Sequence, residues 1–526
     1  MTINIHEPPF CARAVTEDSS VIMRRDHNTY TYKDIKVEVD AQNRVMVSAI
    51  TSEVRFIALR WNGKWPRGAR FMGDTFERSY GDLRWRGLET ENIMSWYFLV
   101  HSDSGNEGYG VKVCPDALCF WVPDNDGLTL WLDVRNGGSG VILSGRTIIS
   151  AEMVCASSAE TNAFGFHKQF CQMMSASPLL PPTPVYGGNN WCYAYGDSSA
   201  EQIIKDSEII RDASEGLENR PYMVIDDGWQ ELSRSSYAHA EGRPYDRGNV
   251  LFPDMPGLAA EMKSLGVRPG IWMRPLKTAE KYINKALLLD GRPYTMDASR
   301  DEVMELVSED ISRLVKWGFE LIKYDYVVRD VLGELFNTLS ALKSKGWHFA
   351  NRGVTSAEIQ KNLSRVIHEA AGSAVLIGCN VAGHLAAGHI HLHRSGDDTS
   401  GRSYTRSIKM GINTLAFRAA QNRVFFATDA DCVCITDKIP WDKNRQLLEL
   451  YSMSGTPLFV SVQPEALNGE IRDSLKTAFV HASKQTNQLE PIDWLDTALP
   501  EEYLIDGKRY SYNWTEQTGN GWIFMT

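Results

Sequence analysis

The stretch WGFELIKYDY (residues 317–326) has the pattern of a buried strand that ends in polar residues. Gly318 can end a preceding helix, apolar residues follow, and Lys323 and Asp325 alternate at the end. Because side chains alternate along a strand, Lys323 and Asp325 face the same side. A pair of this kind indicates either a functional site or a simple structural ion pair.

A helix pattern lies directly before this strand. Ser299 and Glu302 predict a capping box, and Gly318 predicts the C-terminal end. Between them, apolar residues recur at helical spacing: Val303, Leu306, Val307, Ile311, Leu314 and Val315. The segment therefore reads as one helix–strand unit.

The same alternation extends in both directions along the chain. Eight strand candidates are VYGGNNW (185–191), YMVIDD (222–227), VRPGIWM (267–273), ELIKYDY (320–326), AVLIGCN (374–380), HIHLH (389–393), RVFFAT (423–428) and PLFVSV (457–462). Eight parallel strand–helix units predict a closed (β/α)8 barrel, which we place at residues 181–465. The fifth connection, VAGHLAAG (381–388), is too short for a full helix.

The flanking segments have an all-β pattern. Residues 1–180 contain short alternating runs such as TYTYKDIKVEVD (29–40), which predict an antiparallel β-sandwich. Four prolines in SASPLLPPTPVYG (175–187) favour a domain junction near residue 180. RYSYNW (509–514) and GWIFMT (521–526) predict a small β-domain at residues 466–526. The predicted class is a multidomain α/β plus all-β protein.

Bulk properties exclude several functions. A net charge of −11 disfavours nucleic acid as a partner, and the absence of an apolar run of 18 residues disfavours a membrane span. The N-terminus lacks the basic and apolar regions of a secretion signal, so we expect a cytoplasmic protein. Nine cysteines without paired spacing predict reduced thiols, with Cys432 and Cys434 in the core. Nothing in the sequence indicates an oligomeric state.

Polar residues follow the strand candidates at the edge where a barrel of this kind carries its active site. They are Trp191, Asp226, Asp227, Arg274, Lys323, Asp325, Cys379, Asn380, Arg394, Asp398 and Asp429. Cleavage of a glycosidic bond needs one carboxylate at the anomeric carbon and one carboxylic acid that protonates the leaving oxygen. This set offers candidates for both.

These motifs resemble those of glycoside hydrolase clan D, which contains the family 27 and family 36 α-galactosidases. YMVIDDGWQ (222–230) resembles the sugar-binding second strand, and FPDMPGLAAEMKSLGVRPGIW (252–272) the following helix and third strand. WGFELIKYDY resembles the nucleophile strand, and RSGDD (394–398) the arginine and acid/base motif. ATDAD (427–431) and SGTPLFVSV (454–462) resemble the last two strands. The large N-terminal β-region favours family 36.

The resemblance implies a role for each matched position. Asp325 would be the nucleophile and Asp398 the acid/base, with Asp397 as a rival acid/base. The remaining matched residues would bind the sugar: Trp191, Asp226, Asp227, Lys323 and Arg394. The implied activity is a retaining α-galactosidase that needs no cofactor and takes an oligosaccharide or glycoside as substrate. Three of these assignments have structural alternatives: a strand-ending turn at Asp226–Gly228, a loop salt bridge at Arg394–Asp398, and packing at Trp191.

The sequence also departs from the family pattern. Family 36 enzymes carry Trp-x-Glu-Pro after the third strand, whereas this chain has WMRPL (272–276) with Arg274. We expect Arg274 to pair with Asp226 or Asp227, or to bind an anionic or modified sugar. Asn380 and the short fifth connection depart as well. Another α-glycoside, or a raffinose-synthase-like transfer of the sugar, therefore stays open.

Two further hypotheses come from different classes. His389, His391 and His393 alternate on one strand and share a face, as ligands of a metal-dependent barrel hydrolase do. A non-catalytic sugar-binding protein is the other, although the presence of both Asp325 and Asp398 disfavours it.

Overall fold

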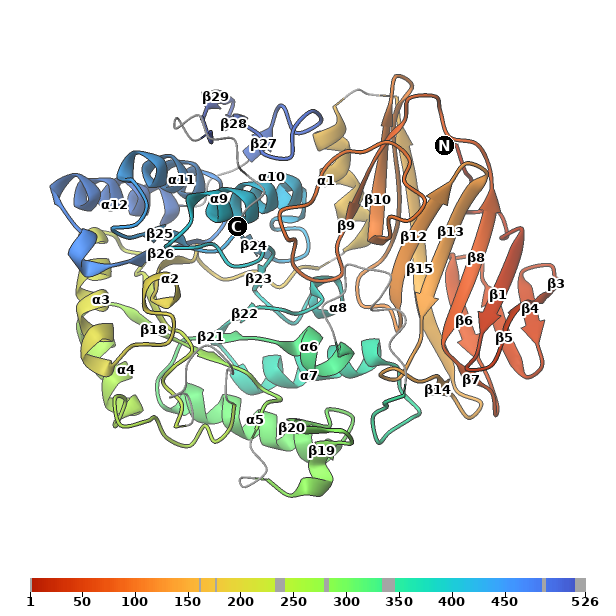
Figure 1. The fold of residues 1–526 in the computed structure, drawn as a ribbon, viewed down its shortest axis with the longest axis horizontal. Coiled ribbons are helices and arrows are strands. Elements are labelled where there is room, and N and C mark those ends of the chain that lie inside the picture. Colours follow the sequence, from red (N-terminus) through yellow and green to blue (C-terminus); the bar gives the residue numbers. More distant parts are fainter. Residues whose placement is uncertain are drawn as a thin grey trace.

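The computed structural model describes residues 2–159, 162–175, 177–231, 242–278, 283–333, 346–484 and 489–515. Figure 1 shows two large parts side by side. One is an antiparallel sheet from the N-terminal third of the chain. The other is a curled parallel sheet with helices around its outside. The predicted strand at 521–526 lies outside the described residues.

The N-terminal part is a sheet of 13 antiparallel strands. Its strands are β1 (Cys11–Val15), β2 (Ser20–Ile22), β3 (Arg24–Asp26), β4 (Thr29–Tyr32), β5 (Ile35–Val39), β6 (Arg44–Ser48), β8 (Phe56–Asn62), β9 (Arg70–Asp74), β10 (Met94–Ser102), β11 (Gly105–Val111), β12 (Leu118–Asp124), β13 (Gly127–Asp133) and β15 (Thr147–Ser158). The order is β2-β1-β8-β13-β12-β10-β11-β15-β6-β5-β4-β3, with β9 on β10. Strands such as β5 alternate between buried and solvent-facing residues, which explains the period of two in the sequence.

Two long strands change partners along their length. β15 pairs with β6 up to Glu152 and with β11 from Met153 onward. β10 pairs with β12 at Met94 and Ser95 and with β11 from Tyr97 onward. Strands that switch partners let a sheet turn back over itself. The antiparallel β-region is thus confirmed, while its description as a two-layer sandwich stays a prediction.

The second sheet has nine parallel strands in the order β24-β23-β22-β21-β18-β17-β16-β26-β25. Their bounds are β16 (Tyr186–Asn189), β17 (Tyr222–Ile225), β18 (Arg268–Met273), β21 (Leu321–Tyr324), β22 (Val375–Gly378), β23 (Leu392–Arg394), β24 (Ala427–Asp429), β25 (Val433–Ile435) and β26 (Leu458–Val462). The two end strands, β24 and β25, are successive segments separated only by residues 430–432. The sheet is therefore curled so far that one short piece of chain joins its two edges.

Helices cover the outer face of this sheet (Figure 1). The longer ones are α3 (Ala200–Ala213), α4 (Met255–Ser264), α5 (Asp301–Lys316), α7 (Ser356–Ala371), α11 (Trp441–Met453) and α12 (Gly469–Ala482). Short helices follow several strands: α2 (Trp191–Ala194), α6 (Val327–Leu332), α8 (Gly383–Ala386), α9 (Tyr404–Ser407) and α10 (Asn413–Arg418). The four-residue α8 confirms that the fifth connection has no room for a full helix. α1 (Ala163–Met174) packs on β11 and β15.

Smaller elements complete the fold. β7 (Glu53–Val54) pairs with β14 (Val141–Ile142), and β19 (Leu288–Leu289) pairs with β20 (Arg292–Met296). β27 (Leu489–Pro491), β28 (Glu502–Ile505) and β29 (Lys508–Ser511) form a three-stranded antiparallel sheet. α12 contacts α3, α11 and β16. The domain boundaries at residues 180 and 465 stay predictions.

Four local expectations are wrong. The sixth strand begins at Leu392, not at 389, and the seventh at Ala427, not at 423. The predicted capping box at the start of α5 is absent, because Arg300 is the N-cap and the Ser299 hydroxyl donates to Asp297 instead. The expectation of reduced thiols fails for one pair, since Cys192 and Cys434 form a disulfide.

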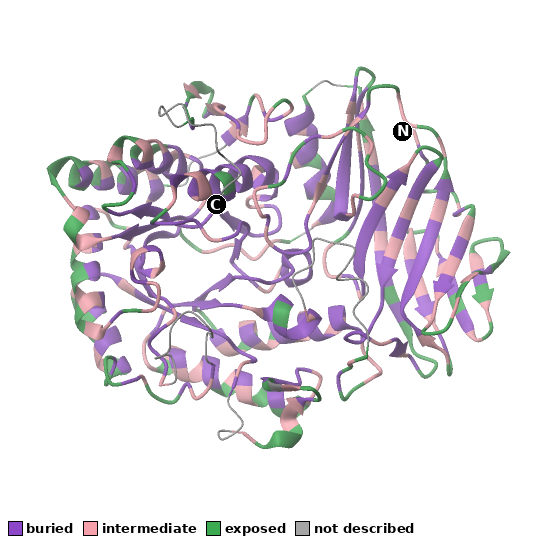
Figure 2. Ribbon diagram, in the orientation of Figure 1, coloured by how far each residue is buried: buried purple, intermediate pink, exposed green. Residues whose placement is uncertain are grey.

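Buried residues form two clusters. The larger runs continuously through the antiparallel sheet and the helix-facing side of the parallel sheet. The smaller lies inside the curl and includes Val224, Leu321, Ile377, Leu392 and Phe459. Figure 2 shows the parallel strands buried along their length, unlike the outer strands of the antiparallel sheet. No helix in the described part of the chain is long and apolar enough to cross a membrane.

Candidate active site

The inward-facing rows of the parallel strands end in polar side chains. Along β21, the buried interior residue Leu321 is followed on the same face by Lys323 and then Asp325. Along β17, Val224 is followed in the same way by Asp226. Because all these strands are parallel, the polar ends gather at one edge of the curl, above a closed apolar interior. Cys379 and Arg394 end the rows on β22 and β23.

Asp226 is held by three donors. Its Oδ2 accepts hydrogen bonds from Asn189 Nδ2 and from Lys323 Nζ, both at 2.7 Å, and its Oδ1 accepts from the Asp227 N–H at 2.9 Å. Burial alone would lower the pKa of Lys323, but the charge of Asp226 raises it well above its usual value. Lys323 is therefore a fixed cation whose carboxylate partner is Asp226. This is an ion pair between strands and not the pair with Asp325 that spacing alone suggests.

Asp227 has the opposite electrostatic character. Burial and then the neighbouring charges of Asp226 and Asp325 raise its pKa to about 7, although a hydrogen bond from Gln230 Nε2 at 2.9 Å counteracts them. A carboxyl group with this pKa changes charge near neutrality. It can accept hydrogen bonds from a ligand through both oxygens only when it is ionised.

Asp325 follows β21 and has one saturated and one open oxygen. Oδ1 accepts from Asn380 Nδ2 at 2.5 Å and from the Tyr326 N–H at 2.6 Å. Oδ2 accepts only a longer bond from Trp272 Nε1, at 3.1 Å, among the residues that the structure describes. These three donors hold the carboxylate in one orientation, as a nucleophile requires.

Asp398 lies in the loop after β23. Its Oδ1 accepts from Arg394 at 2.6 Å, and Arg394 also contacts Asp431 at 2.7 Å. Burial alone would raise the pKa of Asp398, but the charges of Arg394 and Arg78 hold that pKa well below its ordinary value. The side chain is 39% exposed, so water screens part of this effect.

The neighbouring Asp397 has less freedom. One oxygen contacts Arg78 at 3.1 Å and the other contacts Arg406 at 2.6 Å, and the residue is buried. Both of its oxygens are therefore occupied by arginines. Asp398 keeps Oδ2 without a partner within the described ranges, which favours Asp398 over Asp397 as the group that meets a ligand.

Arg78 comes from the N-terminal part of the chain and was missed by the sequence analysis. Its loop is fastened to the loop after β23, because the Ser79 N–H donates to Ser395 O and the Asp397 N–H donates to Ser79 O, each at 2.8 Å. Arg418 also donates to Glu77 O and Ser395 O, at 2.7 Å each. No local motif marks such a contact, since its two sides are more than 300 residues apart in sequence.

Beside Arg78, Glu77 accepts from the Tyr80 hydroxyl at 2.6 Å. Burial raises the pKa of Glu77 to about 6, although the charge of Arg78 counteracts it. On β24, burial likewise raises the pKa of Asp429 to about 6 against the opposing charge of Arg394. The pKa is thus raised at Asp227, Glu77 and Asp429 and lowered at Asp398.

The sequence predicts that Arg274 pairs with Asp226 or Asp227, but Arg274 forms an ion pair with neither residue. Its Nε and a terminal nitrogen donate to the two oxygens of Asp330 on α6, at 2.9 and 2.6 Å. Its guanidinium also lies over the Tyr326 ring, 4.4 Å from the centroid. The partner, Asp330, was invisible to strand-end reasoning because it lies one turn into a helix.

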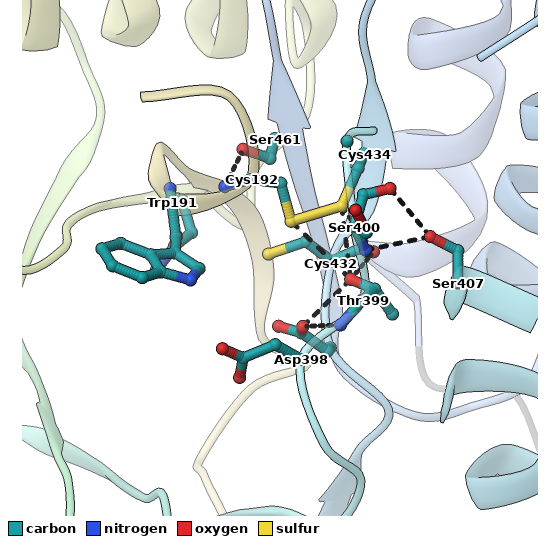
Figure 3. The surroundings of a disulfide bond; sticks show 12 residues. Trp191, Cys192, Asp398, Thr399, Ser400, Ser407, Cys432, Cys434 and Ser461 are labelled. Carbon is teal, nitrogen blue, oxygen red and sulfur yellow. Dashed lines mark hydrogen bonds between the residues drawn. A yellow bond between two sulfur atoms is a disulfide. The ribbon is translucent and has the colours of Figure 1, made fainter. Parts of the chain in front are cut away.

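Trp191 and Asp398 extend toward the same side in Figure 3, away from the Cys192–Cys434 disulfide. The indole of Trp191 is partly exposed and stands edge-on to Tyr195, with centroids 5.6 Å apart. Thr399, next to Asp398, donates its hydroxyl to Cys432 O and contacts Cys434 Sγ. Cys379 is buried at the end of β22, and burial raises its pKa.

The histidines do not form a metal site. His391 Nδ1 accepts the Leu376 N–H, and His393 Nε2 faces Val381 O. His368 lies beside both His389 and His391, with ring centroids 6.0 and 6.2 Å apart, respectively. No group of three or more potential ligands is arranged to hold a metal among the residues described. The arrangement thus gives no support to the metal-hydrolase hypothesis.

No protein-family model matches this chain, and no curated protein matches it by sequence. Solved structures do match it. An α-galactosidase of Thermus thermophilus, in complex with p-nitrophenyl α-D-galactopyranoside, aligns over 95% of this chain and 99% of its own, with a TM-score of 0.61 and 15% identity. A variant of the family 36 α-galactosidase AgaA of Geobacillus stearothermophilus, in complex with raffinose, aligns over 94% and 78%, with a TM-score of 0.57 and 13% identity.

The galactosidase domain of an α-galactosidase–sucrose kinase aligns over 88% of this chain and 69% of that one, with a TM-score of 0.56 and 14% identity. The structural neighbours of this chain are thus α-galactosidases, several of them from glycoside hydrolase family 36. At these identities the likeness establishes the shared fold. The resemblance inferred from the motifs is confirmed at that level.

Proposed function

We propose that this protein is a retaining α-galactosidase that acts in a (β/α)8 barrel and belongs with the family 36 enzymes. The observation that carries the proposal is the placement of Asp325 and Asp398 after β21 and β23, at one edge of a sheet whose fold is shared with α-galactosidases. Asp325 is held by three donors, and Asp398 retains an open oxygen.

In this mechanism Asp325 Oδ2 attacks the anomeric carbon while Asp398 gives its proton to the departing glycosidic oxygen. The product of this step is a β-linked glycosyl ester on Asp325 and a free aglycone. Asp398 then removes a proton from water, the water oxygen attacks the same carbon from the opposite face, and Asp325 leaves as a carboxylate. Two inversions retain the α-configuration. Neither step requires a cofactor.

The charges favour a neutral sugar. Lys323, Arg274, Arg394 and Arg78 each contact a carboxylate of the protein. Because a carboxylate of the protein already matches the charge of each of these cations, none of the four is left to bind an anionic substrate. Asp226 and Asp227 offer acceptors for sugar hydroxyl groups, and Trp191 offers an aromatic face.

Similar structures contain galactosides: one holds raffinose and another holds stachyose. We therefore propose terminal α-galactosides of this size as substrates, with water rather than a second sugar as the acceptor. The expected location is cytoplasmic, from the sequence alone.

A panel of aryl α-glycosides tests the function directly. The purified protein should release p-nitrophenol from the α-galactoside faster than from the α-glucoside, α-N-acetylgalactosaminide or α-glucuronide. Polarimetry or proton NMR should show the α-anomer of galactose as the first product, and raffinose should yield galactose and sucrose. A preference for the glucuronide, or a β-anomer as first product, would reject the proposed sugar or the retaining mechanism, respectively.

Removal of the nucleophile gives the first mutational prediction. Asp325→Gly should lower kcat by at least about 10⁴-fold, because the attacking atom is lost while Asp226 and Lys323 still bind the sugar. Azide should partly restore turnover of the activated aryl α-galactoside and give the β-galactosyl azide. Glu369→Gln, which removes an exposed carboxylate on α7, serves as the control and should keep wild-type kcat. Near wild-type kcat for Asp325→Gly would show that another group is the nucleophile.

A further inference from the structure

Tyr326, the residue after the proposed nucleophile, has an unusual backbone conformation. Its φ is 63° and its ψ is 15°, in the left-handed region. Bulky side chains rarely adopt this region because Cβ approaches the carbonyl oxygen. Such a conformation persists only where its surroundings maintain it, and functional sites are where it is usually found.

The peptide that joins Asp325 to Tyr326 contacts the Asp325 side chain directly. Its N–H donates a hydrogen bond of 2.6 Å to Asp325 Oδ1. Together with Asn380 Nδ2 this bond saturates Oδ1 and leaves Oδ2 as the freer oxygen. The position of this peptide therefore contributes to which carboxylate oxygen is available for attack.

Two contacts maintain Tyr326 in this conformation. Its carbonyl accepts the Asp330 N–H at 3.0 Å, and its ring lies under the Arg274 guanidinium. Arg274 is itself fixed by both oxygens of Asp330 and by Tyr245, whose hydroxyl contacts the backbone N–H and carbonyl of Arg274, each at 2.9 Å. Arg274 is 7% exposed and Asp330 is 2% exposed, while Tyr326 is partly exposed. The ion pair between Arg274 and Asp330 is therefore shielded from water.

We propose that Arg274 and Asp330 are positioning residues. They anchor Tyr326 where the chain passes from β21 into α6, and so fix the peptide N–H that holds Asp325 with Oδ2 free to attack. This inference rests on the proposed function, and it deepens it by giving Arg274 a role in the rate of the first chemical step. It replaces the view of Arg274 as a ligand for an anionic sugar, since both the charge and the face of the guanidinium are occupied within the protein.

The test removes the pair without leaving a buried unpaired charge. Arg274→Met/Asp330→Leu exchanges both residues for apolar ones of similar size, a change that buried ion pairs often tolerate. A matched control lies at the other end of the same strand, where Arg268 contacts Glu320 at 2.8 Å and lies over the Tyr222 ring at 4.3 Å. Arg268→Met/Glu320→Leu therefore removes a similar pair far from Asp325.

We expect the Arg274→Met/Asp330→Leu variant to lose about 10²-fold in kcat, as a nucleophile displaced by about 1 Å would. The dissociation constant of 1-deoxygalactonojirimycin, the sugar mimic found in one similar structure, should change less than about threefold. The control variant should keep wild-type kcat.

A crystal structure of the Arg274→Met/Asp330→Leu variant supplies a readout that is independent of turnover. Tyr326 should leave the left-handed region, and its N–H should no longer donate to Asp325 Oδ1. Wild-type kcat in this variant, or an unchanged Tyr326 and Asp325, would overturn the inference. If this variant does not fold, Arg274→Lys is the second test. It keeps the charge but not the two-pronged contact, so it should lower kcat about tenfold.

Unchanged kcat in a folded Arg274→Lys variant would overturn the inference as well. Failure of the proposed function would give a different result: the wild-type protein would turn over none of the aryl α-glycosides.

Discussion

At the scale of single residues, the proposed mechanism makes its main chemical demand on Asp398, which would have to carry a proton. An acid catalyst must carry a proton when the leaving group departs, yet Arg394 and Arg78 hold the pKa of Asp398 low in the ligand-free protein. In the proposed complex, a bound substrate would remove the water around this partly exposed carboxyl. Because desolvation raises a carboxyl pKa, substrate binding would then favour the protonated acid.

The assignment of Asp398 predicts a dependence on the leaving group. Asp398→Ala should lower kcat/KM for raffinose by about 10³-fold but for an activated aryl α-galactoside by only about tenfold, because a good leaving group needs little proton donation. Asp397→Asn should affect both substrates to the same degree. The ratio of kcat/KM values for the two substrates is the measurement. If the Asp397 variant shows the leaving-group dependence instead, the acid/base is Asp397.

Asp227 predicts a pH dependence of substrate capture. Its pKa is raised to about 7, so the carboxyl is protonated below that pH and loses acceptor capacity for sugar hydroxyls. Binding to the ionised form should make kcat/KM fall about tenfold per unit as pH drops below about 7. Asp227→Asn should abolish this acid limb at a lower absolute rate. Glu77→Gln, which removes a different buried acid, should keep the limb, and its loss there would assign it to Glu77.

At the scale of elements, most strands of the parallel sheet could be predicted from the apolar pattern of the sequence. β17, β18, β21, β22 and β26 lie within the predicted segments, because short buried apolar runs between helix patterns have few other readings. β23 and β24 start later than expected, since Ile390 and the aromatic residues at 425 and 426 are buried but lie before the hydrogen-bonded strands. Strand ends also supplied most of the gathered site residues.

What the sequence could not supply are contacts between distant segments. Arg78 and Asp330 reach the site from an N-terminal loop and from inside a helix, and neither carries a local signal. The disulfide is a third case, because Cys192 and Cys434 are 242 residues apart. Strand-end reasoning finds side chains that a parallel sheet places by repetition, and misses those that tertiary packing places.

The disulfide predicts a redox effect on stability. It joins α2, after the first parallel strand, to β25 at the sheet edge. Without this cross-link the unfolded chain has more conformational entropy, and unfolding is favoured. Cys192→Ser/Cys434→Ser should lower the free energy of unfolding by about 2–4 kcal/mol. Urea unfolding with and without dithiothreitol is the measurement. Reductant should lower the midpoint of wild type and of Cys11→Ser but not of the double variant. A midpoint insensitive to reductant in wild type would mean that the two thiols are not bonded in solution.

At the scale of the whole molecule, the antiparallel sheet is fastened to the part that carries the candidate site. One continuous buried cluster runs through both large parts, and polar contacts fasten them at several points. Asn136 donates to the carbonyls of Asn351 and Val354, and Arg418 donates to Asp74 at 2.7 Å. The N-terminal part thereby places Arg78 beside Asp397 and Asp398, the two aspartates after β23. Stability and activity should therefore depend on the same contact surface.

Arg418 offers the sharpest test of that dependence. It is 2% exposed and donates to the Asp74 carboxylate, to Ser395 O and to Glu77 O, so it joins the loop that carries Arg78 to the loop that carries Asp398. Arg418→Met should lower the free energy of unfolding by about 3–5 kcal/mol, because the buried Asp74 loses its cation.

The same substitution should lower kcat/KM by more than about tenfold at a temperature where the variant is still folded, since both loops that flank Asp398 lose a shared anchor. Arg365→Met is the matched control. Arg365 forms an exposed pair with Glu369 on α7, and its loss should cost less than about 1 kcal/mol with no change in kcat/KM. Urea unfolding and aryl α-galactoside kinetics on the three proteins measure both effects. A variant that is destabilised yet fully active would separate the fastening of the two parts from catalysis, and Arg78 would then be a structural arginine only.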